Sequence, residues 1–219
     1  IVNIAEQTMP TGVQKYMIID GQQRLTTLTL LLLALRDYAA NHPDDCNMPQ
    51  SKFMKCLKNV DEADEDQYKI IPTKKDRDVL FRLIEGHPFD DLGPSKLIAN
   101  YQFFLEKIAE KVLTPLQIYE ATGKLQIVNI TLDRQYDDPQ LIFESLNSTG
   151  VDLSQSDLIR NYILMGLPPN RQKEVYARYW SPMEARFAYE KQSAVMDRFF
   201  RDYLTLCLSR IPKENKVYD

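Results

Sequence analysis

The sequence predicts an α+β fold in which helices predominate, because strand-like segments occur only near the amino terminus and once more in mid-chain. Residues 2–6 and 15–20 are rich in β-branched side chains and flank a turn signal at residues 9–12, so we expect a hairpin. Residues 124–132 hold a second cluster of isoleucine, leucine and valine, and we predict a third strand there that rejoins the first two. The remainder of the 219 residues is predicted to be helices and their connections.

The longest apolar segment predicts a buried helix from about Gln22 to Tyr38. Leucines at i, i+3 and i+7 spacing occupy one face, and further leucines fill much of the rest, which is typical of a helix inside a core. Apolar spacing predicts the other helices at residues 51–60, 74–85, 97–112, 115–121, 139–146, 154–165, 171–189 and 193–209.

Composition and charge restrict the classes of function. Hydrophobic residues make up 44% and charged residues 26%, as in an ordinary globular protein. The net charge of −4 argues against nucleic acid as the main partner, because phosphate neutralisation needs a basic surplus. Cys46, Cys56 and Cys207 form no CxxC pair, which favours reduced thiols and no metal site. The apolar run at 28–35 is too short to span a bilayer, so we predict a soluble, cytoplasmic protein without a membrane partner. The acidic run at 61–66 is predicted to be a solvated loop.

The segment Ile18–Leu28 carries the most informative residues. An apolar strand ends at Asp20, Gly21 permits a tight turn, and a helix starts at once. The first backbone N–H groups of such a helix are unpaired and lie at the positive end of its dipole, which makes a natural anion site. Arg24 adds a planar cation suited to phosphate oxygens.

Four polar neighbours extend this site. The amides of Gln22 and Gln23 can donate to phosphate or hold a water molecule, and Thr26 and Thr27 supply hydroxyl groups within the first turns. An alternative is purely structural: a strand-to-helix turn with Arg24 in a surface ion pair.

The segment Phe143–Asn161 is the second that stands out. Gly150 is a plausible left-handed residue after a helix, and Ser154 is predicted to cap the next helix with Asp157 as its capping-box partner. Two well-capped helices joined by a turn would account for these three residues.

That structural explanation leaves a set of polar residues unassigned. Glu144 and Asn147 are one turn apart on one helix face, and so are Asp157 and Asn161. Polar groups paired at the elbow between two helices could reach a shared ligand.

The run Asp20–Leu28 resembles the signature of the DGQQR family, whose fold is similar to ParB and sulfiredoxin and which includes GmrSD-type modification-dependent restriction enzymes and related phage-defence proteins. The resemblance implies binding, and possible hydrolysis, of a nucleoside triphosphate (GTP, UTP or ATP) with Mg²⁺. Residues 143–161 resemble the family pattern FExLNxxGxxLxxxDLIxN, which suggests that Asn147 and Asn161 face the nucleotide. The residues thus assigned to the phosphate chemistry are Asp20, Gln22, Gln23 and Arg24, and those assigned to nucleotide binding are Gly21, Thr26, Thr27, Glu144, Asn147, Asp157 and Asn161.

The resemblance also implies an organisation and a mechanism. Residues 1–40 and 122–165 would form a ParB-like nucleotide-binding core, with a helical insertion at 41–121 and a helical region at 166–219. Arg24 would neutralise charge on the transferred phosphoryl group, Gln22 or Gln23 would orient the attacking water, and Asp20 would contact Mg²⁺ or act as a base. The domain would sense nucleotide for a nuclease domain or subunit of the same system, and DNA would be engaged through the full-length protein.

Two departures from the family pattern limit these expectations. Members usually carry a segment like IPxYQRxYxW upstream of the motif, whereas here no Tyr-Gln-Arg precedes Asp20, and Trp180 is the single tryptophan. Since the chain also begins at Ile1, we expect a fragment whose nucleotide pocket is incomplete. Many members carry an HNH nuclease, but His42 and His87 are each followed by proline and lie outside any HNH context, so no nuclease activity is expected.

Two other functions remain open. A non-catalytic DNA- or protein-interaction module would use the DGQQR motif only structurally and could draw on Lys74, Lys75, Arg77 and Arg82, which otherwise form a solvated helix face. A sulfiredoxin-like reductase would need a reactive cysteine at the phosphate turn, and that turn contains none.

Overall fold

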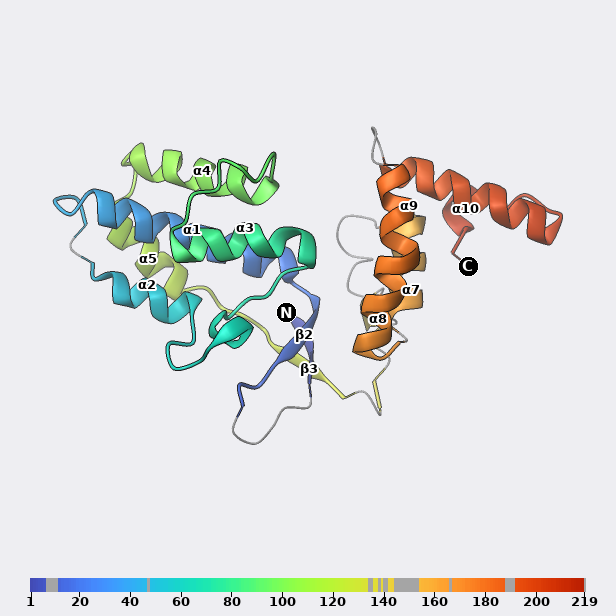
Figure 1. The fold of residues 1–219 in the computed structure, drawn as a ribbon, viewed down its shortest axis with the longest axis horizontal. Helices are drawn as coiled ribbons and strands as arrows, with labels where there is room; N and C mark the ends of the chain where they lie inside the picture. The colour runs from blue at the N-terminus through green and yellow to red at the C-terminus, as the bar shows by residue number, and fades with distance from the viewer. Residues whose placement is uncertain are drawn as a thin grey trace. The chain divides into compact units, whose positions relative to one another are not determined.

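The computed structural model describes residues 1–6, 12–46, 48–133, 136–137, 139, 142–143, 154–165, 167–187 and 192–218, without the side chains of 74–75, 169–170, 173, 192–193 and 215. The chain divides into two compact units, residues 1–131 and 132–219 (Figure 1). Helices predominate and a small sheet lies in the first unit, which confirms the predicted α+β class.

The sheet has three strands in the order β2-β1-β3. β1 (Val2–Ala5) and β2 (Tyr16–Asp20) pair antiparallel, which confirms the predicted hairpin. β3 (Ile130–Leu132) continues a parallel ladder on the other side of β1, in which the amine of Ile1 donates to the Val128 carbonyl at 2.8 Å and the Ile130 amide donates to the Ile1 carbonyl at 3.0 Å. The third strand is therefore shorter than the predicted span of 124–132. Strand propensity marks that whole span, but in the described part of the chain only its last residues have a neighbouring strand.

The helices of the first unit pack around one central helix (Figure 1). This helix, α1 (Gln22–Asn41), contacts α2 (Gln50–Leu57), α4 (Lys96–Ala109) and α5 (Pro115–Gly123). Its buried leucines are Leu30, Leu32, Leu33 and Leu35, which confirms the predicted core helix, while Leu31 is partly buried. The remaining elements of the unit are a 3-10 helix at Asp64–Gln67 and α3 (Lys74–Glu85), which has the predicted bounds.

Two charged features of the first unit could not be read from periodicity. Arg36 of α1 is only 6% exposed, and its guanidinium donates to the carbonyls of Ile84 at 2.5 Å and Leu83 at 2.8 Å. It thereby adds a donor to two carbonyls at the carboxyl end of α3, of which that of Leu83 also accepts from the Gly86 amide at 3.3 Å. The predicted helix at 97–112 ends at Ala109 instead, because Lys111 takes a left-handed φ of 56°.

The second unit is a group of helices around Trp180, which is 4% exposed and stacks on Phe200. The helix predicted at 171–189 occurs as α8 (Pro169–Val175), a π-helical turn (Tyr176–Trp180) and α9 (Ser181–Arg186). The turn precedes Pro182, which has no N–H to donate to the carbonyl four residues earlier.

The other helices of this unit agree with the predictions to within one or two residues. They are α7 (Gln155–Met165) and α10 (Gln192–Leu208), and a short 3-10 helix follows at Glu214–Lys216. The helix predicted at 139–146 falls mostly outside the described residues. Among the helices that are described, none combines the length and the continuous apolarity that crossing a bilayer requires.

Candidate functional site

The turn between β2 and α1 is built on Gly21. Asp20 ends the strand, Gly21 has φ 100° and ψ 7°, and Gln22 begins the helix. A Cβ atom on Gly21 would lie 3.0 Å from Cγ1 and 3.4 Å from Cα of Ile1. Glycine is therefore required twice, for the left-handed backbone and for the close approach of Ile1, and the predicted tight turn is confirmed.

The amino-terminal end of α1 presents free backbone donors. Its first helical hydrogen bond runs from the Leu25 amide to the Gly21 carbonyl at 3.0 Å, so the amides of the three residues before Leu25 have no acceptor within the helix. No side chain of the described chain caps this end, and the first turn contains no acidic residue. The positive end of the helix dipole is therefore open to an anion.

The two charged residues of the turn pair with each other. The Nη2 atom of Arg24 lies 2.5 Å from Oδ2 of Asp20, with the arginine side chain 69% exposed and the aspartate 25% exposed. The ion pair of the structural alternative is thus present. An exposed pair of this kind contributes about 1 kcal/mol or less, so an anion with a higher charge than a carboxylate can displace Asp20 at small cost.

The neighbouring polar side chains divide into two groups. The Gln22 amide nitrogen donates to the Ile18 carbonyl at 2.8 Å, and the Thr26 hydroxyl donates to the Gln22 carbonyl at 2.9 Å, so both stabilise the turn locally. Gln23 and Thr27 are exposed, and the Gln23 amide bonds to none of the described residues. Of the two glutamines, Gln23 is the one whose donor is available to a ligand.

The second motif is described only from Ser154 onward. Glu144 and Asn147 lie outside the described residues, as does Gly150. The predicted cap is confirmed: the Asp157 amide donates to the Ser154 hydroxyl oxygen at 3.1 Å, and that hydroxyl donates to Oδ2 of Asp157 at 2.7 Å. The Asp157 carboxylate also lies 3.0 Å from the Arg160 guanidinium, so it has two partners within α7.

The amino-terminal end of α7 already holds a carboxylate. The amides of Ser156 and Gln155 donate to the Asp197 carboxylate at 2.7 and 3.3 Å. Asp197 comes from α10, and no local pattern could have indicated this contact between residues some forty positions apart. The end of α7 is therefore closed by an anion of the chain itself, whereas that of α1 is open. Asn161 lies in α7, one helical turn after Asp157, and α7 belongs to the second unit. Its contact with residues 20–24 of the first unit therefore stays a prediction.

The basic residues of the alternative function are paired where they are described. The Arg77 guanidinium lies 2.5 Å from Glu65, and that of Arg82 lies 2.6 Å from Asp91. These carboxylates reduce the positive charge that a DNA backbone would meet on α3. The predicted acidic loop at 61–66 is largely exposed, but it is not simply solvated, since it supplies Glu65 and also Asp66, which pairs with Lys15.

A magnesium–triphosphate ligand would find one carboxylate at this turn. Mg²⁺ in such sites is commonly held by one or two carboxylates together with substrate phosphates, and Asp20 supplies one carboxylate beside the free amides. Within the described ranges, no three histidine, cysteine, aspartate or glutamate side chains gather into a metal site. A cation here would accordingly need oxygen atoms from the ligand.

Fold and site together define a helix-rich α+β protein with an anion-receptive strand-to-helix turn. Residues 2–164 match the family model of the GmrSD restriction endonuclease, N-terminal domain, and the chain belongs to that family. This confirms the family recognised in the sequence and gives the chain a role in a phage-defence restriction system. No curated protein and no solved structure gives a significant match. The match spans β1 to α7, and the helices from α8 onward lie beyond it.

Proposed function

We propose that the chain is a nucleoside-triphosphate-binding and -hydrolysing sensor domain of a modification-dependent restriction system, with its phosphate site at residues 20–24. The observation that carries the proposal is the uncapped start of α1, where free backbone donors lie beside Arg24 and Asp20. The family match supports it, because it associates this sequence with a restriction system that contains a nuclease domain.

Binding would exchange the partners of one ion pair. The backbone amides at the start of α1 and the guanidinium of Arg24 would donate to the phosphate oxygens, and Asp20 would be the carboxylate that holds the metal in place of its ion pair with Arg24. Bound Mg²⁺ supplies charge neutralisation for the phosphates. GTP, UTP and ATP all present the same triphosphate, so this site does not select the base.

Hydrolysis would depend on Gln23 and Arg24. The amide of Gln23 is exposed and can orient the attacking water, whereas the amide nitrogen of Gln22 is engaged with β2. Arg24 stabilises the negative charge that grows during phosphoryl transfer.

The nucleotide state would reach the rest of the system through α1. This helix begins at the phosphate turn and runs into the core against α2, α4 and α5, so a movement of its first turn is felt by packed side chains. A nuclease domain or subunit would receive the signal, and DNA would be bound by the full-length protein.

Isothermal titration with GTP, UTP and ATP in Mg²⁺ tests the site directly. We expect micromolar affinity in the wild type and a loss of tenfold or more (about 1.4 kcal/mol or more) in Arg24→Ala, because the variant lacks the cation that faces the phosphates. Arg198→Ala is the matched control, since Arg198 is an 84% exposed arginine of α10 whose nearest carboxylate lies 3.9 Å away. Unchanged affinity in folded Arg24→Ala contradicts the assignment. Salt-dependent DNA binding without nucleotide would favour the interaction module.

A further inference from the structure

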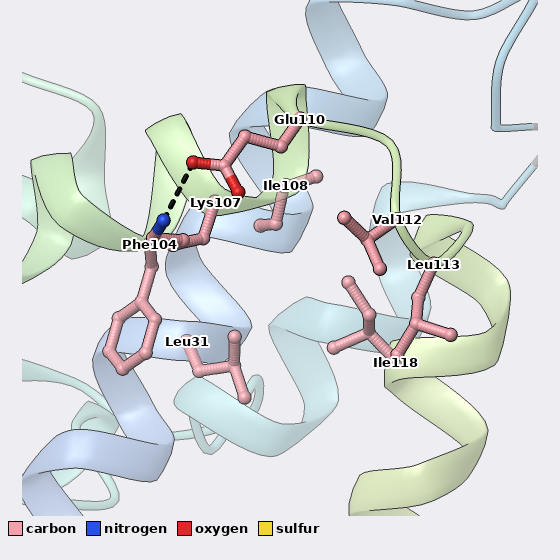
Figure 2. A pocket seen from close by; sticks show the side chains of 8 residues that line it. All are labelled: Leu31, Phe104, Lys107, Ile108, Glu110, Val112, Leu113 and Ile118. Atoms are coloured by element: carbon pink, nitrogen blue, oxygen red, sulfur yellow. Dashed lines mark hydrogen bonds and ion pairs between the residues drawn. The ribbon is translucent and has the colours of Figure 1, made fainter.

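The pocket of the first unit, of about 270 Å³, lies between α1, α4 and α5 and has apolar walls (Figure 2). The two charged residues that line it, Lys107 and Glu110, pair with each other at 2.6 Å. The pocket therefore offers no unpaired charge to a nucleotide. The contacts that bear on the proposed function lie instead around α7 of the second unit, which carries the described part of the second motif.

The start of α7 is held by residues that lie beyond the family match. Two of its amides donate to the Asp197 carboxylate of α10. In addition, Oε1 of Gln155, the first residue of α7, accepts from the amides of Val217 and Tyr218 at 2.9 and 3.0 Å. The segment that follows α10, residues 211–218, is here called the strap. It therefore returns to the first turn of the helix that carries the second motif.

The strap joins α10 to α7 at several points. The Arg201 guanidinium of α10 donates to the Pro212 carbonyl at 2.9 Å and so fixes the beginning of the strap. Farther along, the side chain of Val217 is only 4% exposed. The ring of Tyr218 packs edge-on against Tyr162 of α7, with the ring centroids 5.9 Å apart. The strap thus contacts α7 at its first residue and again about two turns later, on either side of Asp157 and Asn161.

The contact between the strap and α7 is small enough to open separately from the rest of the unit. Ile211 is 72% exposed, and the side chain of Glu214 is 85% exposed although it pairs with Arg201. The two hydrogen bonds to Gln155 exchange for bonds to water when the strap leaves, so each contributes only modestly. Segments with few buried contacts open at a lower free energy than the whole domain.

We propose that the strap positions the first two turns of α7 for nucleotide binding and that Gln155 is the positioning residue that holds it closed; this inference rests on the proposed function. With the strap closed, the turns that carry Asp157 and Asn161 are fixed at both ends. With the strap open, α7 keeps Asp197 but loses the contacts at Gln155 and Tyr162, so these turns fray. The strap is a conformational control on the affinity for triphosphate.

Hydrogen exchange of the whole chain, followed by mass spectrometry, tests the strap itself. Gln155→Met keeps the length of the side chain and removes the acceptor, and we expect exchange about tenfold faster over residues 155–162 and 211–218. Gln155→Glu keeps an acceptor for both amides and should stay within about twofold of the wild type. Gln102→Met is the matched control, because Gln102 is an exposed glutamine of α4 that bonds to none of the described residues. Unchanged exchange in Gln155→Met overturns the proposal.

Titration with GTP and Mg²⁺ tests whether the strap serves the nucleotide site. Gln155→Met and Val217→Asp open the strap from its two sides, and we expect each to weaken binding about fivefold, with Gln155→Glu restoring the wild-type affinity. The double variant should bind no more weakly than either single variant, because both changes break one contact. Circular dichroism melts confirm that every variant is folded.

The outcomes separate the strap from the proposed function. A Gln155→Met protein that exchanges faster but binds GTP as the wild type does overturns the positioning role, and so do additive losses in the double variant. A wild type that binds no triphosphate contradicts the proposed function instead. The exchange comparison then decides by itself whether Gln155 holds the strap closed.

Discussion

The Oδ2 atom of Asp20 and the Nη2 atom of Arg24 lie 2.5 Å apart, so the last residue of β2 and the first turn of α1 form an ion pair over Gly21. The pair neutralises a site whose backbone donors and helix dipole favour an anion. It also assigns each residue a separate partner in the proposed complex, the metal for the carboxylate and phosphate for the guanidinium. Binding of metal and of triphosphate should therefore be coupled, each raising the affinity for the other.

Asp20→Asn is expected to raise the affinity for triphosphate without Mg²⁺ and to lower it with Mg²⁺. Without Mg²⁺ the variant should bind triphosphate about tenfold more tightly than the wild type, because Arg24 is released and a repelling carboxylate is removed. With Mg²⁺ it should bind more weakly, because the protein contact to the cation is lost. Titration with and without a chelator measures both. Asp202→Asn is the control, since Asp202 also lies four residues from an arginine on one helix: it follows Arg198 and forms an exposed pair with it. Equal affinities of wild type and Asp20→Asn in both conditions would contradict the exchange.

Gly21→Ala is expected to destabilise the first unit by about 2–3 kcal/mol, from a left-handed alanine and a Cβ atom pressed against Ile1. Gly86→Ala isolates the first cost, because Gly86 has φ 71° but no atom within 4 Å of the added Cβ, and it should lose only about 1 kcal/mol. Urea unfolding of the three proteins measures the difference. Equal losses in the two variants would show that the approach of Ile1 imposes no restraint.

Alkaline pH should weaken the first unit through Tyr68. Burial raises the pKa of Tyr68 to about 12 from an ordinary value of 10.0, and its hydrogen bond to Glu85 adds to the shift. The unfolded tyrosine ionises first as the pH rises, so the contribution of Tyr68 is complete below pH 10 and is lost as the pH approaches about 12. The stability difference between the wild type and Tyr68→Phe should therefore shrink between pH 10 and about pH 12, the window set by that shift. Tyr16→Phe, at an exposed tyrosine of β2, is the control. A difference that stays constant over this range rules out the effect.

Local patterns in the sequence predicted most elements of the fold, because helix ends and strand pairs leave local signals. The helix at 74–85 has the predicted bounds, and the turn at Gly21 and the cap at Ser154 are present. The residues that sequence alone could not place act over long separations. Arg36 pairs with carbonyls of α3 and Asp197 closes the start of α7, and neither partner is marked by periodicity.

The site was predictable to the same extent. Gly21, Asp20 and Arg24 meet because they adjoin one turn, and a sequence motif records such neighbours. The motif left open whether Arg24 forms an ion pair, and it could not show that Asp20 is the partner or that the Gln22 amide bonds to β2, since both depend on the path of the backbone around Gly21.

The two described polar residues of the second motif should respond differently to substitution. Asp157→Ala removes the partner of Ser154 and Arg160, so it should lower the stability of the second unit by about 1 kcal/mol. Asn161→Ala should leave stability within about 0.5 kcal/mol, because its side chain bonds to no other residue of the described chain. If Asn161 contacts the nucleotide, its substitution instead weakens triphosphate binding several-fold. Thermal melts and titrations of both variants separate the roles. A stable Asn161→Ala protein with wild-type affinity would exclude Asn161 from the site and leave the second motif a structural elbow.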